Sequence, residues 1–106
     1  MSTTVKNLTS PRSGEPVKNQ FVIDVDGVET FQSYQTAIAK NRSGMFTISS
    51  NYNYSVTTSR YFNQWLKSYG LDDNDIAHVK KWLKTAKHGD TDYSTSRYSL
   101  YYVDSL

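Results

Sequence analysis

Apolar residues recur at helical spacing in two adjacent segments between residues 57 and 89, and this pattern predicts a pair of helices joined by a tight turn. In the second segment Asp72 is the expected N-cap, because its carboxylate can accept the unpaired amides of the first turn. Leu71 precedes it and can pack on Ile76 as a hydrophobic staple. Gly89 is the expected C-terminal stop. The apolar face of this helix consists of Ile76, Val79, Leu83 and Ala86.

The first segment has the same organisation and ends at Gly70, which suits a helix C-terminus. Thr57 is its expected N-cap. Because only a short connection separates the two helices, we expect them to be neighbours, either antiparallel or sharply crossed. Their apolar faces would then meet in the core. The stripe on the first helix consists of Phe62, Trp65, Leu66 and Tyr69.

A strong hairpin signal lies nearer the N-terminus, where Asp26-Gly27 separates two runs with strand character, residues 20–25 and 28–33. Two registers are compatible with this signal. In the first, a two-residue turn pairs Val25 with Val28.

In the second register a three-residue loop, with Gly27 in a bulge, pairs Phe21 with Phe31. We prefer this second register, because it places Phe21, Ile23 and Phe31 on one face of the hairpin, and the buried face usually determines the register.

Weaker patterns surround the helix pair. Met45–Ser50 alternates apolar and polar residues and predicts a third strand. Arg97–Val103 is dense in Tyr, Leu and Val, which favours a last strand. Residues 34–40 have a helix-compatible composition and are expected to form one or two helical turns, followed by a turn at residues 41–44. Residues 1–16 are polar and contain Pro and Gly, so we expect a loop-like N-terminal segment.

These elements predict one domain spanning residues 1–106, of the α+β class. The expected architecture is a small antiparallel sheet, made of the hairpin, the third strand and the C-terminal strand. The sheet packs against the two-helix pair of residues 57–89.

Composition excludes several kinds of site and indicates where the protein acts. The chain contains no Cys, so disulfides and thiolate metal sites are excluded. No apolar run approaches the length of a membrane span, and residues 1–10 lack the apolar core of a signal peptide. We therefore expect a cytoplasmic protein that needs no membrane partner.

The charge distribution is more informative than the net charge of +2. Residues 76–89 contain no acid, and three of their lysines, Lys80, Lys84 and Lys87, recur at i, i+4 and i+7. Such a basic stripe on residues 76–88 can neutralise phosphates, which makes DNA or RNA binding one hypothesis. The alternative is a solvated outer face that is balanced by the acidic residues 72–75.

Aromatic residues support a second hypothesis, protein binding. Nine Tyr occur among 106 residues, and Tyr and Trp are favoured at interfaces, although Tyr also fills strands and small cores. Trp82 is expected to be either a core contact or an exposed anchor. Arg12, in a loop, could meet a phosphate or a carboxylate. The expected partner-binding residues are Arg12, Lys80, Lys81, Trp82, Lys84, Lys87, Tyr98, Tyr101 and Tyr102.

Catalytic chemistry finds little support. The only histidines are His78 and His88, and no nucleophile elbow or phosphate-cradling glycine loop is present. Asp75 and His78 could share one helical face, but two ligands do not make a metal site. We expect no enzyme activity, no metal and no cofactor.

Several short motifs carry a resemblance to a known group of proteins. The chain resembles small uncharacterised proteins encoded by bacteriophages and related mobile elements, over about its first two thirds, through Leu66. The resemblance implies a viral origin and action in the cytoplasm of a bacterial host. It also implies that the protein binds and inhibits or modulates a host macromolecule, most simply a host protein, as inhibitors of CRISPR nucleases and other defence systems do. The motifs are Asn7–Gly14, Asn19–Phe21, Phe31–Tyr34, Tyr54-Ser55 and Thr57-Thr58.

Overall fold

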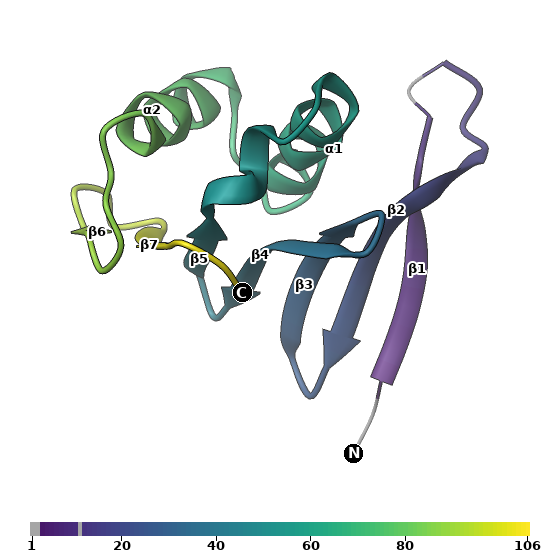
Figure 1. The fold of residues 1–106 in the computed structure, drawn as a ribbon, viewed down its shortest axis with the longest axis horizontal. Coiled ribbons are helices and arrows are strands. Elements are labelled where there is room, and N and C mark those ends of the chain that lie inside the picture. The colour runs from purple at the N-terminus through teal and green to yellow at the C-terminus, as the bar shows by residue number, and fades with distance from the viewer. Residues whose placement is uncertain (1–2, 11) are drawn as a thin grey trace.

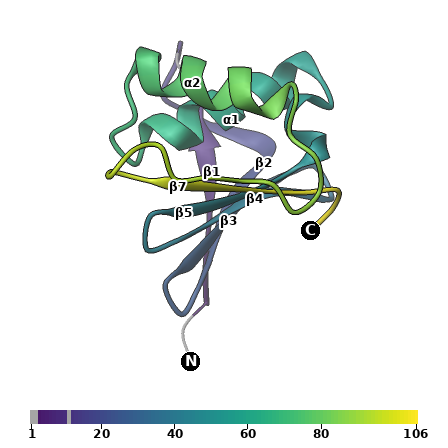
Figure 2. The same cartoon turned by 90° about the vertical axis from the view of Figure 1, so that its left-hand side faces the viewer.

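The computed structural model describes residues 3–10 and 12–106. Over these residues the chain forms a twisted seven-stranded sheet with two α-helices on one face (Figures 1 and 2). The sheet order is β1-β2-β3-β4-β5-β7-β6. In chain order the elements are β1 (Thr3–Thr9), β2 (Pro16–Val25), β3 (Val28–Ser33), β4 (Thr36–Arg42), β5 (Met45–Ser49), the 3₁₀-helix η1 (Ser50–Asn53), α1 (Val56–Lys67), α2 (Asp73–Leu83), β6 (Thr91–Asp92) and β7 (Ser99–Val103).

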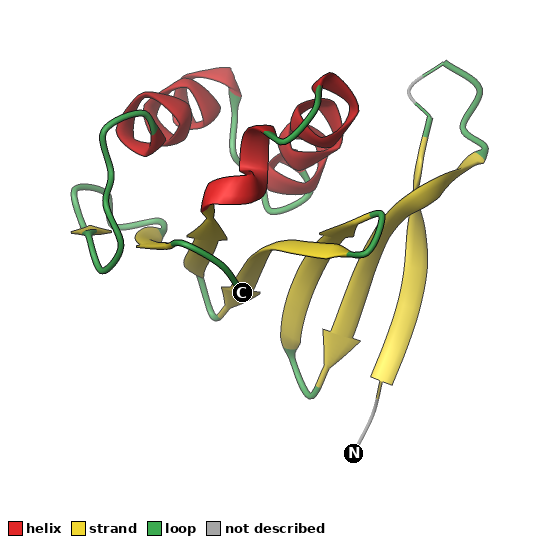
Figure 3. Ribbon diagram, viewed as in Figure 1, coloured by secondary structure: helices red, strands yellow, loops and turns green. Residues whose placement is uncertain are grey.

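The expected small antiparallel sheet packed against a helix pair is wrong. Strands β1 to β5 do pair antiparallel in chain order, but β7 pairs in parallel with β5, from Met45 opposite Ser99 to Ser49 opposite Val103. Parallel neighbours require a long crossover, and here both helices supply it. The sheet is therefore mixed, and it forms the larger part of the fold (Figure 3).

Strands β1 and β4 occupy segments without a recognisable strand pattern, as does the two-residue strand β6. Thr3–Thr9, within the N-terminal segment expected to be loop-like, is the edge strand β1 and pairs with β2. It is exposed along nearly all its length, so its side chains needed no apolar alternation. Residues 1, 2 and 11 of that segment lie outside the described residues.

Residues 34–40, expected to form helical turns, mostly belong to strand β4. A register shift opposite Phe31 and Gln32 makes Ile38 the extra residue of a bulge. Ile38 and its neighbour Ala39 are both fully buried. The bulge breaks the alternation that identifies a strand, which explains why the sequence pattern was misinterpreted.

The preferred hairpin register is also wrong, and the two-residue turn is the one observed. Val25 pairs with Val28, across a turn in which Asp26 and Gly27 have φ of 53° and 87°. Two positive φ values are what a type I′ turn requires, and its twist matches that of the strands. Phe31 therefore lies opposite Val22 on the buried face.

The third strand, the last strand and the turn before β5 are confirmed. β5 and β7 fall inside the predicted ranges. Ser43 and Gly44 form the turn with φ of 52° and 88°. The turn is thus another two-residue connection, between Arg42 and Met45.

The start of α2 confirms the predicted cap. The Asp72 side chain accepts from the Asp75 amide at 2.9 Å, and the Asp75 side chain accepts from the Asp72 amide at 3.0 Å, which completes a capping box. Leu71 and Ile76, the predicted staple pair, are both buried. The N-cap of α1 was predicted two residues too late, because Ser55 accepts from the Thr58 amide at 3.0 Å.

The end of α2 lies earlier than predicted, at Leu83 instead of close to Gly89. One local and one tertiary hydrogen bond hold the backbone after Leu83 in a non-helical path. The Lys87 amide donates to the Asp90 carboxylate at 2.8 Å, and the Gly89 amide donates to the Tyr102 carbonyl at 2.9 Å. Lys84 is the C-cap, so Lys87 lies outside the helix.

Of the helices among the described residues, none combines the length and the apolar character needed to cross a membrane.

The core lies between the helices and one face of the sheet. Trp65 is its centre, with ring centroids 6.0 Å from Phe31 and 5.5 Å from Phe46. Figure 2 shows both helices on this side, and none of the described helices covers the opposite face. The core is thus one-sided, and Phe21 on the open face stays half-buried.

A charged contact fastens the start of β7 to α2. The Arg97 guanidinium donates to the Asp75 carboxylate, which is largely buried. The pKa of Asp75 lies below its usual range, first because its carboxylate accepts from the Asp72 amide and then because of Arg97. The cap of α2 and the entry to β7 therefore share one carboxylate.

The one-sided core predicts different responses from two phenylalanines on neighbouring strands. Phe31→Ala should lower the free energy of unfolding by about 3–5 kcal/mol, because a fully buried ring in the aromatic cluster is lost. Phe21→Ala, on the other face, is the matched control and should cost distinctly less. Urea unfolding followed by circular dichroism measures both, and equal losses would contradict a core confined to the helix side.

Candidate functional site

A cleft opens between α2 and the short edge strand β6. Its hollow of about 380 Å³ is lined by His78, Lys81, Trp82, Thr85 and Asp92. The first three side chains come from α2, at positions 78, 81 and 82, so they lie on one side of the helix. Asp92 is one of the two residues of β6, and its strand partner is Leu100 of β7. We call this the α2–β6 cleft.

Trp82 is neither a core residue nor a fully exposed anchor. It is half-buried and packs in part against the core, and its ring meets that of Tyr102 edge-on at 6.4 Å. The contact with Tyr102 holds the indole in place while part of it borders the cleft. A ring held in this way can contact a partner at a small cost in side-chain entropy.

Polar contacts fix the opposite wall. The His78 Nε2 atom lies 3.0 Å from Asp92 Oδ2 and 3.3 Å from the Ser94 hydroxyl, and the Ser94 amide donates to Asp92 Oδ1 at 2.7 Å. The pKa of Asp92 is lowered, first by the Ser94 side chain, then by the Ser94 amide and His78. These contacts tie α2 to the edge of the sheet.

The His78, Asp92 and Ser94 side chains do not form a catalytic triad. In a triad the carboxylate and the hydroxyl contact different nitrogens of the imidazole, so that the ring can pass a proton between them. Here both contact Nε2. A nitrogen that donates to Asp92 cannot also accept the proton of Ser94, so these contacts do not form the proton relay of a triad.

The predicted lysines separate into different environments. Lys81 lines the cleft, whereas Lys80 turns back between the helices and donates to the Ser59 hydroxyl at 2.8 Å. Burial lowers the pKa of Lys80. Lys84 and Lys87 are exposed beyond the last turn of α2, so the stripe expected from Lys80, Lys84 and Lys87 does not form on a helix.

The predicted tyrosines are likewise divided. Tyr98 is buried, with its ring 6.2 Å from Phe46 and 6.4 Å from that of His78, and burial is the main cause that raises its pKa. Tyr102 lies beside Trp82. Tyr101 lies on the open face of the sheet, because consecutive residues of β7 point to opposite faces and Leu100 points into the core.

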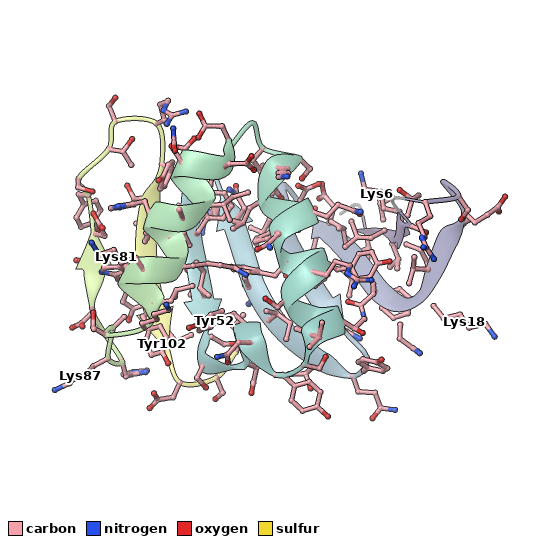
Figure 4. All side chains as sticks on the ribbon, turned by 90° about the horizontal axis from the view of Figure 1, so that it is seen from above. Lys6, Lys18, Tyr52, Lys81, Lys87 and Tyr102 are labelled. Atoms are coloured by element: carbon pink, nitrogen blue, oxygen red, sulfur yellow. The ribbon has the colours of Figure 1, made fainter. Side chains whose placement is uncertain are left out.

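Figure 4 shows where the predicted basic and aromatic residues meet. Lys81, Lys87 and Tyr102 lie at the end of the molecule formed by α2 and β7, while Lys6 and Lys18 lie at the opposite end. Arg12 is exposed in the β1–β2 connection, where it lines a different hollow together with Arg60. Of the predicted partner-binding residues, Lys81 and Trp82 line the cleft, and Tyr102 contacts the Trp82 ring.

Sequence reasoning missed Thr85 and Asp92, and it considered His78 only as a catalytic base or a metal ligand. The pair Asp92 and Ser94 does carry a local signal, since an Asp side chain often accepts from an amide two residues later. The contact between His78 and Asp92 spans 14 residues and has no local signal.

The described residues contain no cluster of side chains suited to bind a metal ion. Among residues 3–10 and 12–106, no group of three or more His, Cys, Asp or Glu side chains could hold an ion. Asp75 and His78, considered as shared ligands, are used separately, by Arg97 and by Asp92.

Comparison with protein families is informative about the N-terminal part of the chain. Residues 3–77 match the model of a family of unknown function, DUF8033. The chain belongs to this family. No curated protein and no solved structure matches the chain. The expectation of an uncharacterised family is thus confirmed, and the match extends beyond Leu66, the limit expected from the resemblance.

The family match and the cleft occupy different parts of the chain. The matched residues include β1 to β5, η1, α1 and the first residues of α2. All the residues that line the α2–β6 cleft follow residue 77. The matched range therefore covers strands β1 to β5 and α1, and both the cleft and strands β6 and β7 lie outside it.

The lowered pKa of Asp92 predicts an acid-dependent contribution to stability. Ionised Asp92 is stabilised in the folded chain, so its contribution is complete well above the ordinary pKa of 3.8 and disappears as the pH falls through the lowered folded pKa. Asp92→Asn should therefore be less stable than the wild type at pH 7, and the difference should shrink below about pH 4. Urea unfolding between pH 7 and pH 3 measures it.

Ser94→Ala provides a second variant for this prediction, because it removes the largest cause of the pKa shift. Its stability deficit should also narrow at low pH. A deficit that stays constant from pH 7 to pH 3 in both variants would show that ionisation of Asp92 contributes nothing.

Proposed function

We propose that the protein acts by binding another protein through the α2–β6 cleft. The observation that carries the proposal is the position of Trp82, which is half-buried, held by Tyr102 and placed at the wall of the cleft. Binding energy at interfaces concentrates in a few such aromatic residues, which lie in pockets and are surrounded by weaker contacts.

The charges around the cleft suit an acidic partner surface. Lys81 is exposed and lines the cleft with Trp82, and Lys84 and Lys87 are exposed at and after the end of α2. Asp92, the acid in the wall, is engaged by His78 and Ser94. A basic surface of this kind speeds the encounter with an acidic protein, and the aromatic contact then slows dissociation. A partner with an apolar side chain for the hollow and carboxylates at its rim fits this arrangement.

The proposed partner is a protein of a bacterial host. This part of the proposal rests on the resemblance to proteins of phages and mobile elements, which implies that the chain inhibits or modulates a host protein. Inhibition of a defence nuclease, including a CRISPR nuclease, is the specific form that the resemblance implies. The cytoplasm of the host is the corresponding site of action.

Nucleic-acid binding by residues 76–88 is the alternative, and the geometry favours it less. It required a helical stripe of lysines, but α2 ends at Leu83 and Lys80 is bonded to Ser59. Lys81 instead lines the cleft together with the aromatic residue Trp82, which suits a protein interface better than a phosphate track.

Affinity capture from a bacterial lysate tests the proposal. The immobilised chain, after nuclease treatment of the lysate, should retain a specific protein that Trp82→Ala and Lys81→Glu no longer retain. Lys40→Glu is the matched charge control, because Lys40 is exposed on β4, away from the cleft. Both cleft variants alter surface or half-buried side chains, and circular dichroism verifies that they fold.

Fluorescence quenching supplies an independent measurement on the captured partner. Trp65 is fully buried, so acrylamide should quench mainly Trp82, and Trp82→Phe should remove the quenchable emission. Addition of the partner should protect Trp82. A partner that all variants retain equally, or that leaves Trp82 quenchable, would place the interface elsewhere. Recovery of nucleic acid alone would favour the alternative.

A further inference from the structure

A second hollow surface lies on the outer side of α1. Arg60, Asn63, Gln64 and Lys67 occur at i, i+3, i+4 and i+7, so they follow one face of the helix, and together they line a hollow of about 370 Å³. All four side chains are polar, and two are cationic. This face of α1 differs from the opposite face, where Trp65 and Leu66 enter the core.

A neighbouring hollow of about 490 Å³ continues this surface toward the β1–β2 connection. It is lined by Ser10, Arg12, Arg60 and Tyr61, so Arg60 belongs to both hollows. The connection is fastened to the helix, because the Gln64 side-chain amide donates to the Thr9 carbonyl at 2.8 Å. We call the two hollows together the α1 groove.

The connection itself is held by its own hydrogen bonds. The Ser10 amide donates to the Glu15 carbonyl at 2.9 Å, and the Gly14 amide donates to the Ser10 carbonyl at 2.9 Å. The Arg12 amide donates to the Ser10 hydroxyl at 3.3 Å. Arg12 therefore lines the same hollow as Arg60, and the groove has two walls, the described residues of the connection and the helix.

The groove is cationic and lacks acidic residues in its lining. No Asp or Glu lines either hollow, and neither Arg12 nor Arg60 forms an ion pair with any of the described residues. Lys67 contacts Asp73 at 3.3 Å, but both side chains are exposed, and such pairs contribute little. Two exposed guanidinium groups thus have no ion-pair partner among residues 3–10 and 12–106.

We propose that the α1 groove binds the phosphodiester backbone of a nucleic acid. The guanidinium fork donates two parallel hydrogen bonds to phosphate oxygens, and two such groups lie side by side here. Arg60 and Lys67 are separated by about 10 Å along the helix axis, which corresponds to about three steps of a B-form strand. Asn63 lies between them, and an amide side chain can contact sugar or base edges, whereas the Gln64 amide already donates to the Thr9 carbonyl.

An acidic protein is a poorer match for the same surface. Protein interfaces centre on an apolar or aromatic anchor, and the aromatic residue that lines this groove, Tyr61, is only 6% exposed. The α1 groove offers cations and amides instead, which is the composition typical of backbone contacts in nucleic-acid complexes. It also lies within the residues matched to the family, so the inference is independent of the α2–β6 cleft.

Fluorescence anisotropy of labelled oligonucleotides tests the inference on the full chain. Probes of one sequence, as single-stranded DNA, duplex DNA and single-stranded RNA, show which form of nucleic acid the groove binds. We expect affinity that falls with salt, and each of Arg12→Ala and Arg60→Ala should lower the slope of log K against log salt by about 0.7 to 0.9. The loss should be similar across sequences, because backbone contacts carry no sequence information.

Two controls make the outcome decisive. Arg42→Ala removes an exposed arginine at the β4–β5 turn and should leave binding unchanged. Trp82→Ala should also leave it unchanged, which separates this site from the proposed protein-binding cleft. Absence of binding at low salt, an equal loss with Arg42→Ala, or equal competition by polyglutamate would overturn the proposal.

Discussion

The packing of one indole ring determines how the two layers of this protein meet. Trp65 is almost fully buried, and its ring lies 6.0 Å from Phe31, 5.5 Å from Phe46, 6.3 Å from Phe62 and 5.2 Å from Tyr69. Two of these rings belong to the sheet and two to α1 or the turn after it. Loss of such a residue typically costs about 3–5 kcal/mol, against a total stability of about 5–15 kcal/mol for a domain. The position of α1, and of the surfaces beside it, depends on this contact.

The elements that sequence analysis identified are those with strong local signals. The N-cap Asp72, the Asp26-Gly27 turn and the alternation of Met45–Ser50 depend on neighbours in the chain, and each corresponds to an observed feature. The strands that were missed depend on distant partners. β1 is stabilised by its ladder with β2, and β4 contains a bulge whose shape is defined by β3. Neither leaves a period of two in the sequence.

The same distinction applies to the candidate site. Trp82 and Lys81 could be selected by residue type, because exposed aromatics and cations near one another are typical of interfaces. The opposite wall could not be selected in this way, because it is formed only when β6 pairs with β7 at the edge of the sheet. The early end of α2 could not be predicted from the sequence either. The Gly89 amide donates to the Tyr102 carbonyl, and this bond joins residues 13 positions apart. Propensity favoured a longer helix, and tertiary contacts prevailed.

The place of β7 in the sheet has a consequence for synthesis on the ribosome. β7 follows both helices in the chain, yet it lies inside the sheet, between β5 and β6. A nascent chain that has emerged only as far as α2 leaves the hydrogen-bonding edge of β5 open, and it also lacks Leu100, a fully buried core residue. Open strand edges readily pair with other chains. Translation must therefore reach Val103 before the edge is closed, so the interval between the synthesis of α2 and β7 is when the growing chain is most exposed to mispairing.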